Sequence, residues 1–241
     1  MGRSGLPTTL VICCRLPHGV PNSTSETLLE VGRSSAVPVT WVTTIDRLAV
    51  LVGQRGTVPS LRDIALEIPA DRSRQELRHL LTRAAEEVPG LDAAAIRGPL
   101  PADHRQLLID SGIRVVCCDR FDDTSRGSRR PAPHGWPCRS TLWGLWEVTP
   151  SGMATPPGLV SHLLPWSSLP GPMPGSLTLV DIAGQGSVSG ELLRSRIEQW
   201  RAWAASQNMP GRAVFASLSD LPTLIAGAAR LSEGGSVLKA A

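Results

Sequence analysis

The sequence predicts an α/β protein in which strands and helices alternate along the chain, arranged most simply as a (β/α) barrel. Three observations lead to this prediction. Short apolar or β-branched runs recur through the 241 residues, amphipathic segments separate most of them, and 21 Pro and 23 Gly supply turns. Seven or eight such units suggest a distorted seven- or eight-stranded barrel, with a doubly wound open sheet as the alternative.

Eight runs are typical of strands, and they lie at 9–14, 37–44, 64–68, 93–97, 113–118, 141–148, 177–182 and 213–216. The first run, TLVICC, is nearly unbroken in its apolar character, as expected for a strand that is covered on both faces. Two of the runs contain adjacent cysteines, which a strand points to opposite faces. Because the five cysteines are also odd in number, we expect no regular disulfide framework.

The predicted helices lie between these runs. Ser73 and Glu76 have the spacing of a capping box, and apolar residues then recur on one face until Pro89-Gly90. Further helices are expected after Asn22 and at 45–52, 101–111, 191–206 and 219–231. The Arg- and Pro-rich segment 119–140 and the Pro-, Gly- and Ser-rich segment 149–174 are predicted loops. The domain prediction is a flexible N-terminus at 1–8, one barrel at 9–231 and a flexible tail at 232–241.

Composition limits the class of protein. Hydrophobic residues make up 41% and charged residues 19%, which excludes a disordered chain, and no apolar stretch is long enough to cross a membrane. Arg15 interrupts the first apolar run before it reaches the length of a signal-peptide core. The net charge of +3 is too small to indicate nucleic acid. We therefore expect a cytoplasmic protein without a nucleic-acid or membrane partner.

The carboxyl ends of the predicted strands hold the candidate functional residues, because parallel strands place their working face there. The predicted pocket comprises Arg15, Glu67, Asp71, Arg97, Asp119 and Trp146. The candidates for a catalytic role are Arg97, Asp181, Glu147 and His18. Paired carboxylates can serve acid–base chemistry, but polar residues are also the ordinary occupants of strand ends. A tryptophan near a barrel mouth can stack on a sugar ring, although packing in the core is the commoner role.

Known nucleophile and cofactor motifs are missing. The sequence has no G-x-S-x-G elbow and no G-x-x-x-x-G-K-[ST] phosphate loop, and no two of its five histidines have ligand-pair spacing. Cys13 and Cys14 with His18 are the best alternative metal set, but cysteines on an apolar strand usually belong to the core. We expect neither a metal nor another cofactor.

Several segments taken in order resemble the polysaccharide deacetylase family, also known as the NodB-homology barrel. Residues 9–14 lie where that family has the strand before its T-F-D-D-G motif, and SAVPVTWV at 35–42 is similar to its second strand. Arg97-Gly-Pro matches the start of its R-x-P-[FY]-G motif, and Leu177 to Asp181 lies where its L-x-H strand is expected. The resemblance covers about residues 9–225 and implies a (β/α) barrel that acts on carbohydrate.

The family's metal motifs are replaced in this sequence. CCRLPHG at 13–19 lacks both aspartates of the first motif, and EIPADRS at 67–73 lacks both histidines of the second. Asp181 stands in the place of the histidine that serves as the family's general acid, and Arg97 remains without an evident aspartate partner. Without the ion, no water is activated at neutral pH. The resemblance therefore implies the fold without the reaction.

Two functions follow as expectations. The first is a non-catalytic, deacetylase-like barrel with a degenerate active site that binds a carbohydrate or a protein partner. The alternative is a hydrolase that acts on carbohydrate, or on another C–N or ester bond, with a rebuilt site. Such a site would use His18 with Asp181 or Glu147, or a metal held by the two cysteines and His18.

Overall fold

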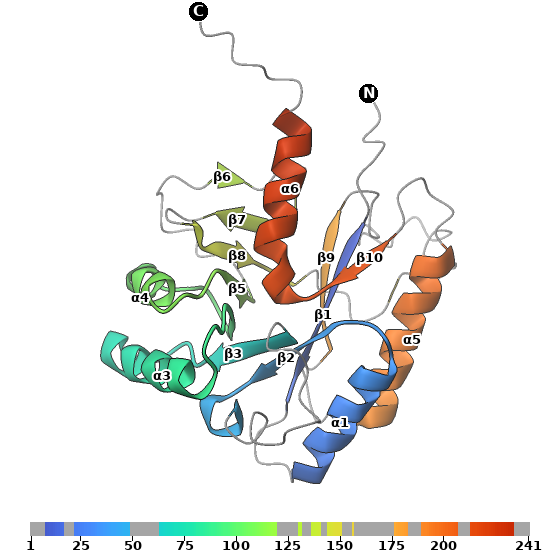
Figure 1. The fold of residues 1–241 in the computed structure, drawn as a ribbon, viewed down its shortest axis with the longest axis horizontal. Coiled ribbons are helices and arrows are strands. Elements are labelled where there is room, and N and C mark those ends of the chain that lie inside the picture. Colours follow the sequence, from blue (N-terminus) through green and yellow to red (C-terminus); the bar gives the residue numbers. More distant parts are fainter. Residues whose placement is uncertain are drawn as a thin grey trace, which may run out of the picture.

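A computed structural model describes residues 8–16, 22–48, 63–119, 130–131, 136–140, 144–150, 156, 176–182, 189–206 and 213–233. Ten strands in this part of the chain form a single sheet (Figure 1). The strands are β1 (Thr9–Arg15), β2 (Val39–Thr43), β3 (Ile64–Ile68), β4 (Ala93–Ile96), β5 (Val115–Cys118), β6 (Arg130–Pro131), β7 (Cys138–Ser140), β8 (Trp146–Val148), β9 (Leu177–Asp181) and β10 (Val214–Ala216).

Most of the sheet is parallel. Strands β1 to β5 follow one another in sequence order, β8 pairs with β5, and both β9 and β10 pair with β1. The last two strands of the order, β7 and β6, run antiparallel to their neighbours. The strands that the structure describes form a curled, open sheet of the half-barrel kind, and the pairings given for them do not close it into a full barrel.

The strand predictions are confirmed for most runs, with small differences at the ends. The loop prediction for 119–140 is wrong at its carboxyl end, because Cys138–Ser140 pairs with β8 and Arg130–Pro131 pairs with β7. The predicted strand at 141–148 is shorter than expected, since β8 begins at Trp146; residues 141–143 lie outside the described part. Most of the predicted loop at 149–174, the flexible start at 1–7 and the tail beyond 233 also lie outside it.

The helices are α1 (Asn22–Ser34), α3 (Arg74–Glu87), α4 (Arg105–Asp110), α5 (Gly190–Ser206) and α6 (Leu221–Glu233), and short 3-10 turns precede α4 and α6. The predicted capping box is confirmed at α3. The Glu76 backbone N–H donates to Ser73 Oγ at 3.3 Å, and the Ser73 N–H donates to Glu76 Oε2 at 2.8 Å. No helix in the described residues is long and apolar enough to cross a membrane.

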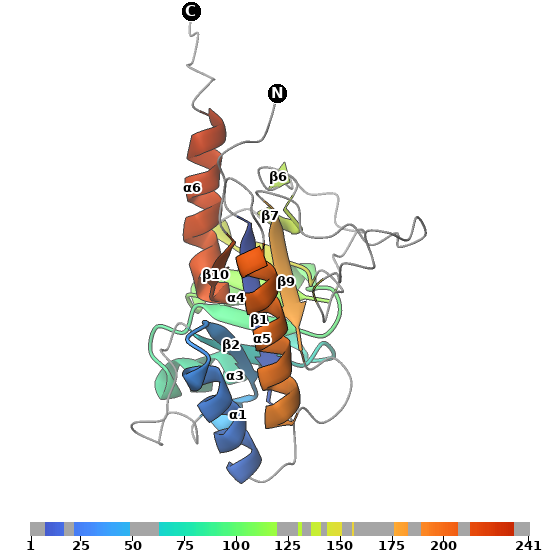
Figure 2. The ribbon, with the colours of Figure 1, turned by 90° about the vertical axis from the view of Figure 1, so that its right-hand side faces the viewer.

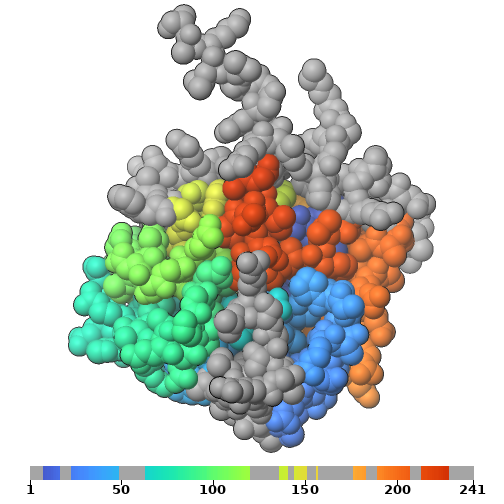
Figure 3. Space-filling view, in the orientation of Figure 1, coloured from blue at the N-terminus to red at the C-terminus, as the bar shows by residue number. Residues whose placement is uncertain are grey.

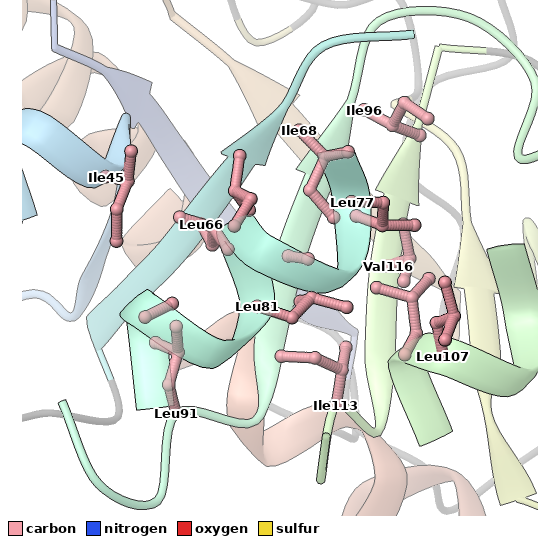
Figure 4. Packing of buried hydrophobic residues seen from close by; sticks show 14 of the residues in the cluster. Ile45, Leu66, Ile68, Leu77, Leu81, Leu91, Ile96, Leu107, Ile113 and Val116 are labelled. Atoms are coloured by element: carbon pink, nitrogen blue, oxygen red, sulfur yellow. The ribbon is translucent and has the colours of Figure 1, made fainter. Parts of the chain in front are cut away.

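Helices cover the outer face of the sheet in two groups. Leu77 and Leu81 of α3 and Leu107 of α4 pack against Leu66 and Val116 of the sheet (Figure 4). Helices α1 and α5 lie side by side over β1 and β2, where they form a second apolar cluster (Figures 1 and 2). This two-sided burial explains why the strands are apolar at nearly every position.

The inner face of the sheet has its own apolar cluster, which is filled partly by small side chains such as Ala65 and Ala95. Leu221 and Ile225 of α6 belong to this cluster, and α6 runs along the molecular surface between α5 and the segments of β5 and α4 (Figure 3). A buried hydrogen bond fixes the start of this element, since the Leu218 N–H donates to Thr40 Oγ1 at 2.9 Å. The apolar filling leaves the carboxyl ends of the strands as the polar end of the inner face.

Candidate functional site

Strand alternation places five charged side chains on the inner face at the carboxyl ends of the parallel strands. Each one follows, two residues later, a member of the inner apolar cluster: Cys13, Ala65, Ala95, Cys117 or Leu179. The five residues are Arg15, Glu67, Arg97, Asp119 and Asp181. We call this group the mouth cluster.

Arg15 is the centre of the mouth cluster. Its Nε donates to Asp181 Oδ2 at 3.1 Å, its Nη1 donates to Glu67 Oε1 at 3.2 Å, and its Nη2 lies 3.5 Å from Asp119 Oδ1. The Arg15 side chain is only 5% exposed. A planar guanidinium presents donors in several directions at once, which suits it to hold carboxylates from three different strands.

The Arg15–Asp119 contact also shows that the sheet is curved. Three strands separate β1 from β5 in the sheet order, yet the two side chains lie within ion-pair distance. The inner faces of β1 and β5 therefore approach each other across the curl. Arg15, Glu67 and Asp119 come from the alternate strands β1, β3 and β5, which is the layered arrangement found inside barrels.

Arg97 and Asp119 form the accessible rim of the cluster. Arg97 Nε donates to Glu67 Oε1 at 3.1 Å, and 59% of the Arg97 side chain is exposed. Asp119 is 49% exposed and accepts a hydrogen bond at 3.2 Å from the backbone N–H of Gly98. Gly98 has φ of +108°, a conformation that side chains disfavour. The rim thus places one donor and one acceptor side chain next to each other.

Glu147, a candidate for a catalytic role, does not belong to the mouth cluster. It pairs with Val116, which faces the outer apolar cluster, so its side chain lies on the opposite face of the sheet from Arg15. There it is completely buried and accepts from Arg105 Nε at 2.8 Å and from Arg139 Nε at 2.6 Å. This pairing joins α4, β7 and β8.

The other predicted residues are dispersed. Trp146 packs against the inner cluster, but it pairs with Val115 at the start of β5 and so lies toward the amino ends of the strands, away from the mouth. Asp71 is an exposed loop residue after β3. His18 lies outside the described residues. His104, at the end of the 3-10 turn before α4, is buried at 3% exposure.

A metal ion does not fit the mouth cluster. The Arg15 guanidinium already lies among Glu67, Asp119 and Asp181, and its positive charge would repel a divalent cation at the same place. Cys13 and Cys14 belong to the inner and the outer apolar cluster respectively, so the two thiols cannot bind one ion. Within the described ranges, no three His, Cys, Asp or Glu side chains form a set that could hold a metal.

All five cysteines are buried and free of disulfides. Burial raises the pKa of the Cys14, Cys117 and Cys138 thiols from 9.0 to about 12, and it raises the pKa of Cys13 and Cys118 well above 9.0. Because the thiolate is the reactive form, these side chains are packing groups at neutral pH and not nucleophiles.

These thiols predict a loss of stability at alkaline pH. In the unfolded chain they lose their protons near pH 9, whereas Cys14, Cys117 and Cys138 keep theirs to about pH 12 when folded. Stability is therefore complete below pH 9 and declines between pH 9 and 12, by about 1.4 kcal/mol per pH unit for each thiol. The measurement is urea unfolding at a series of pH values.

The composition of the chain allows a change in stability between pH 9 and 12 to be assigned to the cysteines. Tyrosine is absent and Lys239 is the single lysine, so few side chains other than cysteine titrate in this range. The variant Cys138→Ala should show a shallower decline than the natural protein. An unchanged slope in that variant would show that Cys138 ionises as readily in the folded protein as in the unfolded chain.

Comparison with known proteins finds likenesses among solved structures. No protein-family model matches the sequence, and no curated protein matches it. Among solved structures, a family 4 carbohydrate esterase from Bacillus anthracis is similar at 15% sequence identity and a TM-score of 0.41, covering 90% of this chain and 83% of that one.

Proposed function

We propose that this protein is a non-catalytic carbohydrate-binding protein, built on a distorted (β/α) half-barrel of the deacetylase kind, and that the mouth cluster binds its ligand. The observation that carries the proposal is the neighbouring position of Arg97 and Asp119 at the rim, directly after the paired residues Ile96 and Cys118. Both side chains are about half exposed. Each forms an ion pair with a buried member of the cluster, Arg97 with Glu67 and Asp119 with Arg15. Sugar hydroxyls are donors and acceptors at once, and fixed charged side chains form strong hydrogen bonds with them.

The same cluster supports binding over catalysis. Glu67 and Asp181 are engaged by Arg15, and Glu67 also accepts from Arg97. A general base must be within reach of the proton that it removes and free to take it. Glu147 faces the outer layer, so Asp181 is the carboxylate that remains for the hydrolase alternative.

Binding of oligosaccharides by isothermal titration calorimetry tests the proposal. The probes are tetrasaccharides of glucose, mannose, xylose and N-acetylglucosamine. We expect at least one of them to bind, and we expect Arg97→Ala and Asp119→Ala each to weaken its binding by about tenfold or more. The matched control is Arg33→Ala, which removes an exposed arginine that pairs with Glu30 at the end of α1, away from the mouth.

The outcomes separate the alternatives. If no tetrasaccharide binds, or if the rim variants bind as well as the natural protein, the mouth cluster is not a carbohydrate site. Release of acetate from the N-acetylglucosamine tetrasaccharide, lost in Asp181→Asn and retained in Arg33→Ala, would replace the proposal with the hydrolase alternative.

A further inference from the structure

We infer that the ligand of the mouth cluster is an uncharged sugar that presents two adjacent hydroxyl groups to Arg97 and Asp119. This inference rests on the proposed function and narrows it to one class of ligand. It follows from the order of donors and acceptors at the rim, from the register of the two strands that carry them, and from the charges that already surround each side chain.

The register places the two rim residues side by side. Strands β4 and β5 are parallel, and Ile96 pairs with Cys118. Arg97 and Asp119 directly follow the ends of these two strands, and the N–H of Gly98 donates to Asp119 Oδ2. Neighbouring strands lie about 4.8 Å apart, a separation that two adjacent ring hydroxyls can bridge with one hydrogen bond each.

The chemistry of the two side chains selects the ligand group. A guanidinium only donates hydrogen bonds, and an ionised carboxylate only accepts them. A ligand that engages both must accept at Arg97 and donate at Asp119. Hydroxyl groups do both, whereas a uronic acid carboxylate only accepts and a protonated amine only donates.

The surrounding charges favour a neutral ligand. Glu67 lies 3.1 Å from Arg97 Nε, and Arg15 lies 3.5 Å from Asp119 Oδ1, so each rim charge already has an opposite charge beside it. A carboxylate on the ligand would face Glu67 as well as Arg97. An ammonium group on the ligand would face Arg15 and Arg97 as well as Asp119. A hydroxyl pair adds no charge to this balance.

A comparison of charged and neutral probes tests the inference with the full chain. The neutral probes are the glucose, mannose, xylose and N-acetylglucosamine tetrasaccharides, the anionic probe is tetragalacturonate, and the cationic probe is the fully deacetylated glucosamine tetrasaccharide. We expect the best neutral probe to bind about tenfold or more tightly than either charged probe. We also expect its affinity to be nearly unchanged between low and high sodium chloride, as for a ligand without charge.

Two variants test whether Arg97 and Asp119 form these hydrogen bonds with the hydroxyl groups. Arg97→Lys keeps the charge but loses the planar pair of donors, and Asp119→Asn keeps the shape but loses the charge. Each should weaken the neutral probe, while Arg33→Ala should bind it like the natural protein. Tighter binding of either charged probe would overturn the inference and leave carbohydrate binding intact. Absence of binding by all of the probes, neutral and charged, would overturn the proposed function together with the inference.

Discussion

Replacement of Arg15 by methionine is expected to lower the free energy of unfolding by about 3–5 kcal/mol, because it removes the shared partner of three carboxylates. Glu67 is 5% exposed and Asp181 is 15% exposed, so neither can recover full hydration once the guanidinium is gone. Asp119 is half exposed and should contribute less. Urea unfolding followed by tryptophan fluorescence measures the change.

Two further variants identify the cause of that loss. Arg33→Met makes the same substitution at an exposed pair on α1 and should cost less than about 1 kcal/mol. Arg15→Met combined with Glu67→Gln should be more stable than the sum of the two single changes predicts, since the double variant removes a charge from each side. Strict additivity would mean that the Arg15–Glu67 contact does not stabilise the fold.

Replacement of Glu147 by glutamine should have an effect of similar size on the opposite face of the sheet. Glu147 is fully buried between Arg105 and Arg139, so its loss leaves two arginines facing each other with reduced hydration. We expect a loss of about 3–5 kcal/mol in the free energy of unfolding. The measurement is urea unfolding, with Glu30→Gln on the surface of α1 as the control.

Ligand binding distinguishes the two clusters. Because Glu147 lies on the outer face, Glu147→Gln should bind the best tetrasaccharide like the natural protein at a temperature where it is folded. Arg15→Met should weaken that binding along with stability, since it releases Asp119 from its position at the rim. Loss of tetrasaccharide binding by folded Glu147→Gln would show that Glu147 contributes to the binding site.

Sequence patterns predicted the strands well because the sheet is buried on both faces. Runs such as 9–14 and 64–68 are apolar at most positions, and they lie within the observed β1 and β3. Strands β6 and β7 escaped prediction because they are only two and three residues long and contain Arg and Pro, which are typical of loops. Their place is decided by pairing with β8, a contact that no local pattern records.

The members of the mouth cluster were predictable, since all five stand at or next to the carboxyl ends of predicted strands. Their mutual contacts were not, because they depend on the curl that brings β1 to β5. For example, the carboxylate partner of Arg97 is Glu67, which lies 30 residues earlier in the sequence. The face of the sheet that Glu147 occupies was not predictable, because the strand that carries it, Trp146–Val148, is too short to show which of its sides is inward.

The burial of every cysteine has a practical consequence for site-directed spectroscopy. Thiol reagents should find no reactive side chain in the folded protein, so a cysteine introduced on the surface can be labelled alone. Asp71 is a favourable position, since it is exposed and directly follows Ala70, whose methyl group lies close to Gly98 at the rim. An environment-sensitive fluorophore attached there would report a sugar entering the mouth without any alteration of the mouth cluster.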